Sequence, residues 1–255
     1  MIRKILLSCV VFSVFAPLAL VGADTPMAPA TLTVAQIVEK NVAAKGGLQT
    51  WRAVQSMSLS GKMDAGGTNN VQLPFMLEMK RPRKSRIEIE FGGKTAVQVY
   101  DGVNGWKVRP FLGHSDAEPF TTEEMKKASQ EQDLDGPLLD YVAKGTKVEL
   151  EGIEQVEGRD AYKLKLTLKN GEVRRVWVDA QTFLDVKIDG TRRLDGKPHS
   201  MTTYLREYKS VQGLMVAHLL ETTVDGVKDP EKMTIERIVV NPKLEDSLFA
   251  KPKGK

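Results

Sequence analysis

The sequence contains almost no cysteine, since the only one among its 255 residues is Cys9, close to the N-terminus. Cys9 lies in a segment with the pattern of a cleavable signal peptide, in which two basic residues precede an apolar run over residues 5–21. A retained membrane anchor is the alternative, because this run is barely long enough to span a bilayer. Pro17 and the small residues before position 24 favour cleavage after Ala23.

The mature chain would then hold no cysteine, which excludes disulfides, zinc-thiolate sites, redox pairs and thiol nucleophiles. It would also lack a strong charge of one sign. The formal net charge of +4 falls to +2 once the two basic residues of the signal segment are removed, so no nucleic-acid partner is indicated. We expect a signal peptide at 1–23, a flexible leader at 24–31, a single domain at 32–250 and a basic tail at 251–255.

Motifs for catalysis are scarce as well. The three histidines, His114, His199 and His218, do not occur at metal-binding spacing, and His114 is explained as part of a polar loop. The GGKT stretch at 92–95 lacks the spacing of a phosphate loop and joins two predicted strands, which indicates a hairpin turn. We therefore predict no enzyme activity, no metal and no cofactor.

What the chain has in abundance is alternation of apolar and polar residues with a period of two, interrupted by Gly, Asn-Gly and Asp-Gly. This pattern is typical of antiparallel strands joined by hairpins. It predicts about eleven strands, at 57–63, 71–80, 85–91, 95–101, 147–153, 160–169, 172–179, 183–189, 199–208, 213–223 and 231–240. So many strands would leave long edges unless the sheet curled or closed.

Helical patterns occur in two places. Thr33 and Gln36 form a capping box before a run with helical apolar spacing, and a second short helical segment covers 48–54. In the middle of the chain, 121–132 has the pattern of a polar helix and 135–145 that of a second helical segment. The second segment would place Leu138, Leu139 and Val142 together on one side.

The Asn170-Gly171 pair predicts a hairpin with a two-residue turn. In that register Leu164 lies opposite Trp177, so both would share one apolar face with Leu166. A curled sheet of this width has more inner surface than two short helical elements can fill, and larger barrels of this kind enclose a cavity.

Several stretches are similar to one known family. Lys80-Arg81-Pro82 before an alternating strand, VYDGVNGW at 99–106 and NPKLEDSLFAKP near the C-terminus resemble the LolA/LolB-like periplasmic lipoprotein carriers, in particular the outer membrane lipoprotein-sorting proteins. The resemblance covers nearly the whole mature chain. It implies an incomplete antiparallel β-barrel whose apolar concave face is covered by a helical lid, and a non-catalytic role in shielding acyl chains.

The resemblance also implies site residues. Arg81 would hold the lid or pass the cargo on. Our own candidates for the lid are residues 34–54 and 121–145, and we expect Leu138, Leu139 and Val142 to occupy the mouth of the empty cavity. The lipid-binding cavity would be lined by Met57, Leu59, Leu73, Phe75, Leu77, Ile87, Ile89, Phe91, Trp106, Leu164, Leu166 and Trp177.

The expected function is that of a monomeric periplasmic carrier of lipoprotein acyl chains or other lipids, with an inner-membrane donor and an outer-membrane acceptor. One alternative is a lipid- or lipoprotein-sensing module of the same fold that signals through a protein partner. An exported hydrolase on a β-barrel is a third interpretation, and it would need a nucleophile or metal constellation assembled in space.

Overall fold

A computed structural model describes residues 32–253 except 65–70, 132–133 and 195–196. The signal peptide and leader expected at 1–31 lie outside the described residues, as do the turn signals Gly66-Gly67 and Asp195-Gly196. No helix in the described part of the chain is both long enough and apolar enough to cross a membrane.

The described chain begins with two helices, α1 (Val34–Ala44) and α2 (Leu48–Arg52). The capping box predicted from the sequence is present, because the Thr33 hydroxyl accepts from the Gln36 amide and the Gln36 side chain accepts from the Thr33 amide. Ile37, Val38 and Trp51 are the buried apolar residues of these helices. The predicted N-terminal helix and the short segment after it are therefore confirmed.

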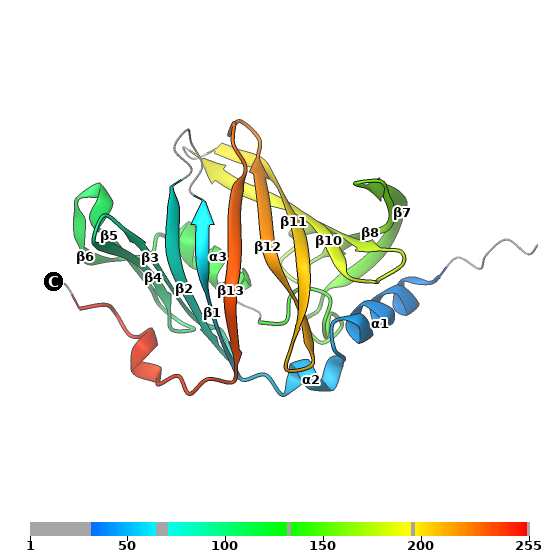
Figure 1. The fold of residues 1–255 in the computed structure, drawn as a ribbon, viewed down its shortest axis with the longest axis horizontal. Helices are drawn as coiled ribbons and strands as arrows, with labels where there is room; N and C mark the ends of the chain where they lie inside the picture. Colours follow the sequence, from blue (N-terminus) through cyan, green and yellow to red (C-terminus); the bar gives the residue numbers. More distant parts are fainter. Residues whose placement is uncertain (1–31, 65–70, 132–133, 195–196, 254–255) are drawn as a thin grey trace, which may run out of the picture. The chain divides into compact units, whose positions relative to one another are not determined.

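One antiparallel sheet forms the body of the fold (Figure 1). Its thirteen strands stand in the order β6-β5-β4-β3-β2-β1-β13-β12-β11-β10-β9-β8-β7, so β6 and β7 are its two edges. The strands are β1 (Ser56–Asp64), β2 (Gln72–Lys80), β3 (Lys84–Phe91), β4 (Lys94–Tyr100), β5 (Gly105–Arg109), β6 (His114–Pro119), β7 (Lys147–Val156), β8 (Arg159–Thr167), β9 (Val173–Asp179), β10 (Asp185–Leu194), β11 (Lys197–Val211), β12 (Leu214–Val224) and β13 (Glu231–Val240).

The eleven predicted strands are all present, and β5 and β6 are additional. They extend the sheet beyond β4 and are followed by helix α3 (Thr122–Glu131), which matches the polar helix predicted at 121–132. A 3-10 helix, η1 (Pro110–Leu112), joins β5 to β6, and a second, η2 (Asp246–Phe249), follows β13. The sequence did not reveal β6, HSDAEP, because it has no apolar alternation.

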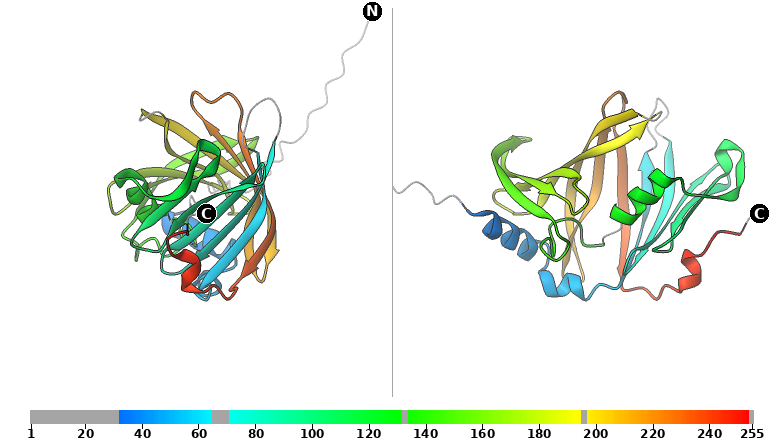
Figure 2. Two further views of the ribbon diagram at one scale, coloured as in Figure 1. Left: turned by 90° about the vertical axis from the view of Figure 1, so that its left-hand side faces the viewer. Right: turned by 180° about the vertical axis from the view of Figure 1, so that it is seen from behind.

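The sheet curves around one of its faces, as the views in Figure 2 show. A bulge between Ser60 and Gly61 in the β1–β13 pair contributes to the bend. Gly61 is required there, because a Cβ at this position would lie 2.0 Å from the carbonyl oxygen of Thr234. We call the face that carries Leu59 and Phe75 the inner face, since α2 and the segment 134–145 pack against it.

Candidate functional site

The inner face of the central strands is a continuous apolar surface. Leu59 of β1 lies opposite Leu77 of β2 and Ile238 of β13, and Leu77 lies opposite Ile87 of β3. Seven of the residues predicted to line a cavity share this face: Met57, Leu59, Leu73, Phe75, Leu77, Ile87 and Ile89. Met57, Leu59 and Phe75 are buried, whereas the other four keep part of their surface exposed.

One cross-strand row on this face is partly exposed along its whole length. It runs from β2 to β11, and we call it the methionine row: Leu73, Met63, Met233, Leu220 and Leu205. Methionine is flexible and polarizable, so a row with two adjacent methionines suits apolar ligands of variable shape. Of this row only Leu73 was among the predicted lining residues, because a pairing across β1 and β13 cannot be read from local alternation.

The inner face of β8 and β9 is sealed. Leu164 and Leu166 lie on this face, but both are fully buried in a core with Ile37 and Val38 of α1. The prediction that they line a ligand cavity is not matched by their surroundings, because α1 already covers them. Phe91, another predicted lining residue, is too exposed to line an enclosed cavity. It lies at the end of β3, its side chain is 51% exposed, and its ring makes an edge contact with Phe111.

The placement of Trp177 predicted from the sequence is wrong. The turn at Asn170-Gly171 contains three residues rather than two, because the Leu168 amide donates to the Glu172 carbonyl and Gly171 takes φ 85°. A shift of one residue moves every side chain of a strand to the other face. Trp177 therefore lies opposite Lys163 on the outer face, and Lys187 Nζ sits 4.0 Å from its ring centroid.

Trp106 also lies on the outer face. It pairs with Val99 of β4, which pairs with Arg86 of β3, and Arg86 alternates with the inner-face residue Ile87. The expectation that Trp106 lines the cavity came from its position after the Asp101-Gly102 turn. The register of β4 and β5 directs it away from the inner face.

The segment 134–145 fills the inner side between the two halves of the sheet, and we call it the lid. Leu138 and Leu139, which were expected to occupy the mouth of the empty cavity, are both fully buried. Leu139 packs with Trp51, Leu59 and Phe75, whereas Leu138 packs in the other core with Leu164 and Leu166. Two adjacent lid residues thus enter two different cores.

The lid is a series of turns and not the helix predicted from its pattern. Gly136 and Asp140 both have positive φ, 73° and 51°, which a right-handed helix does not allow. Val142 is consequently 72% exposed and does not occupy the interior, which corrects the prediction that it shares a side with Leu138 and Leu139.

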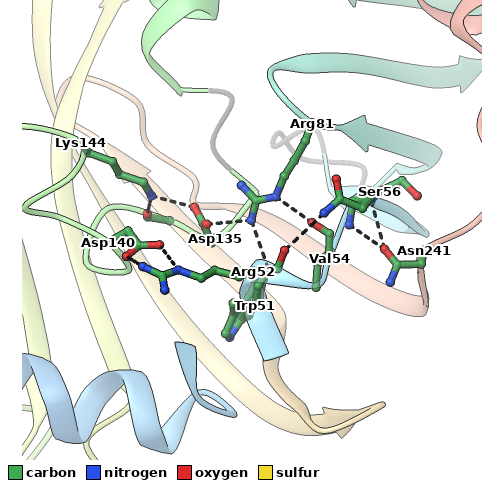
Figure 3. A network of polar contacts seen from close by, with 11 residues as sticks. Trp51, Arg52, Val54, Ser56, Arg81, Asp135, Asp140, Lys144 and Asn241 are labelled. Atoms are coloured by element: carbon green, nitrogen blue, oxygen red, sulfur yellow. Dashed lines mark hydrogen bonds and ion pairs between the residues drawn. The ribbon is translucent and has the colours of Figure 1, made fainter. Parts of the chain in front are cut away.

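Arg81 holds the lid by polar contacts (Figure 3). Its Nε donates to the carbonyl oxygen of Val54 at 2.7 Å, and its Nη2 donates to Asp135 Oδ2 at 2.8 Å and to the carbonyl oxygen of Trp51 at 3.2 Å. One guanidinium therefore joins the turn after β2, the connection from α2 to β1 and the start of the lid. The resemblance implied that Arg81 holds the lid, and its contacts agree with that role.

Three further residues complete the attachment of the lid. Lys144 Nζ donates to Asp135 Oδ1 at 2.7 Å and to the carbonyl oxygen of Gly136, which closes the lid on itself. Arg52 of α2 forms a two-point ion pair with Asp140 at 2.9 and 2.6 Å (Figure 3). The ion pairs of Arg81 with Asp135 and of Arg52 with Asp140 could not be predicted from the sequence, because their partners lie 54 and 88 residues apart.

The carboxylates of the lid are held in the ionised state. Burial disfavours the charge of Asp135, but hydrogen bonds from Lys144 and Arg81 outweigh this cost, so the pKa of Asp135 lies below its usual value. The hydrogen bonds from Arg52 likewise lower the pKa of Asp140. Both attachments are therefore fully charged at neutral pH.

Helix α3 adds a second cover over the inner side (Figure 2). Lys107 of β5 is buried on the inner face, and its Nζ contacts both carboxylate oxygens of Glu124 at 2.6 and 2.7 Å. Thr121 and Glu124 form a capping box at the start of the helix. Among the described residues, no group of three or more His, Cys, Asp or Glu side chains could hold a metal ion.

Comparison with known proteins supports the same architecture. No family model matches the sequence, and no curated protein matches it significantly. Solved structures do match. A LolA superfamily protein from Nitrosomonas europaea has 15% identity and a TM-score of 0.56, with 87% of this chain and 99% of the other covered.

Two further structures agree. An outer membrane lipoprotein-sorting protein domain from Vibrio parahaemolyticus has 14% identity and a TM-score of 0.55, covering 84% of this chain and 94% of its own. A DUF1329 family protein from Desulfovibrio piger has 15% identity and a TM-score of 0.58, covering 86% and 98%. The protein therefore has the LolA-like fold, which confirms at the level of architecture the resemblance of its motifs.

Proposed function

We propose that this protein is a non-catalytic periplasmic carrier that binds lipoprotein acyl chains or other lipids on the inner face of its sheet. The observation that carries the proposal is the methionine row, an apolar strip that stays partly exposed inside a curved sheet. The name of the lipoprotein-sorting domain from Vibrio parahaemolyticus, which shares the fold, points to the same class of cargo. Loading at the inner membrane and delivery at the outer membrane complete the proposed role.

The energetics allow a lipid to replace the lid. Burial of an acyl chain of about sixteen carbons gains roughly 12 kcal/mol before association costs, at ~0.8 kcal/mol per methylene. Withdrawal of Leu138 and Leu139 forfeits about 3–6 kcal/mol, at roughly 1.5–3 kcal/mol for each side chain. A bound chain can therefore offset an opened lid, and a closing lid assists release to an acceptor.

Lipid extraction tests the proposal directly. Protein purified from its native host is extracted with organic solvent, and the extract is analysed by mass spectrometry. We expect acyl lipids in near-stoichiometric amount from the wild type. The variant Met63→Glu, which places a charge in the methionine row, should lose them.

Met76→Glu is the matched control, because Met76 lies on the outer face of β2 opposite Ser60 and is 40% exposed. It should retain the lipid. Absence of lipid from the wild type in every preparation, or equal loss from both variants, contradicts the proposal.

A further inference from the structure

A hollow lies on the outer face of the sheet, which is the face opposite to the methionine row. Its volume is about 770 Å³, and its walls are strands β3–β5 together with the C-terminal segment 247–253. We call it the outer pocket. Small-molecule sites typically enclose 300–1,000 Å³, so the pocket is of a size that holds a ligand.

The C-terminal segment is a fixed wall of this pocket. Lys80 Nζ donates to the carbonyl oxygen of Leu244 at 2.7 Å and pairs with Asp246 at 2.8 Å. Lys84 pairs with the same carboxylate at 3.0 Å, and Phe249 is fully buried. These contacts hold residues 244–249 against the outer face, beside the pocket.

The lining combines an apolar floor with a cationic rim. Val97 and Val108 pair across β4 and β5 and form the floor with Leu248. Lys94, Lys251 and Lys253 lie at the rim, where all three are exposed. The one carboxylate of the lining, Glu88, is already paired with Arg86, so the uncompensated charge of the pocket is positive.

We propose that the outer pocket binds an amphipathic anion, a short acyl or alkyl chain that ends in a carboxylate or a phosphate. The chain would lie on Val97, Val108 and Leu248, and the anionic group would face the lysines of the rim. This site is separate from the inner face, so it does not depend on the carrier role proposed above.

Methyl NMR on the full mature chain distinguishes the two sites. The valine and leucine methyl groups are labelled, and dodecanoate, dodecyl phosphate or dodecanol is titrated below its micelle concentration. Both anions should shift Val97, Val108 and Leu248 saturably, with Val156, which is buried in a separate cluster with Ala161 and Trp177, as the unshifted reference. Dodecanol lacks the charge, so its affinity for this site should be lower than that of dodecanoate by a factor of roughly five or more.

Two variants test the rim and the volume. The double substitution Lys251→Gln and Lys253→Gln should weaken dodecanoate binding roughly five-fold. The control pair Lys209→Gln and Lys243→Gln removes the same charge from exposed positions outside the pocket and should leave binding unchanged. Ser115→Trp, which fills the pocket from an exposed position, should abolish the shifts.

The source of the ligand is distinguished by the two anions. Stronger binding of dodecyl phosphate indicates a phospholipid-like headgroup, and stronger binding of dodecanoate indicates a free fatty acid. Shifts confined to inner-face methyls such as Leu73 and Leu220, or equal affinity for dodecanol and dodecanoate, overturn the outer-pocket proposal while leaving the carrier proposal intact.

Discussion

The inner faces of β1–β3 and of β8–β9 use the same kinds of side chain but are covered differently. On β8 and β9, Leu164, Leu166 and Val176 are fully buried under α1 and Leu138. On β2 and β3, Leu73 and Ile89 keep part of their surface exposed. The difference arises because α1 packs on the β8–β9 side, which leaves the inner face of β2 and β3 less completely covered.

The largest expected effect tests whether the two halves differ in coverage. Leu164→Ala should reduce the free energy of unfolding by about 2–5 kcal/mol, because it leaves a cavity in a sealed core. Leu73→Ala should cost only about 1 kcal/mol, because part of that side chain already meets solvent. Urea denaturation of the two variants measures both values, and equal losses would show that the two halves are covered alike.

The second prediction concerns the two attachments of the lid. Arg81→Ala removes donors from Asp135 and from the carbonyl oxygens of Val54 and Trp51, so the lid should open more often. Hydrogen exchange of the Gly145 and neighbouring lid amides should accelerate roughly ten- to one-hundred-fold.

Arg52→Ala is the matched variant for this experiment. Its ion pair with Asp140 is more exposed, so the same amides should accelerate far less. An equal response of the lid to both substitutions would rule out a special role for Arg81.

The third prediction compares methionines on different surfaces. Added acyl ligand should slow oxidation of Met63 and Met233 by peroxide several-fold, because both lie in the methionine row. Met76 on the outer face should oxidise at an unchanged rate, and buried Met57 should react slowly in either state. Peptide mass spectrometry gives each rate, and ligand protection of Met76 would indicate a different binding surface.

The smallest effect is expected from pH. The pKa values of Asp135 and Asp140 are lowered in the folded protein, so their contribution to lid stability is complete above the unfolded value of about 3.9. It is lost as the pH falls through the lower folded values. Lid exchange, corrected for intrinsic rates, should therefore not vary between pH 5 and 8 and should rise below pH 4, and a transition near pH 6 would contradict this assignment.

The strands could be predicted because alternation and glycine turns are local signals. The strand β6 lacked that signal. Register was harder: one extra residue in the Asn170-Gly171 turn reversed the face of Trp177. The lid was recognised as an insertion, but its turns depend on Asp140 taking a positive φ beside Arg52, a contact between segments distant in sequence.

The inner-face position of the predicted lining residues was recovered in part for the same reason. Leu73 and Ile87 were identified because they alternate within single strands. Leu138 and Leu139 were identified from a helical pattern over 135–145, where the structure has turns instead. The pairing of Met63 with Met233 joins β1 to β13, which are 170 residues apart. The cover that α1 places over Leu164 is likewise a tertiary contact, and no local pattern in the sequence encodes it.

The insertion of Leu138 and Leu139 into separate cores has a mechanical consequence. Because the two residues are covalent neighbours, neither can withdraw from its core without pulling on the other. Entry of a hydrocarbon tail beneath one half of the sheet would then loosen packing beneath the other half. The lid would then open as one cooperative unit, so that a ligand loads in a single concerted step.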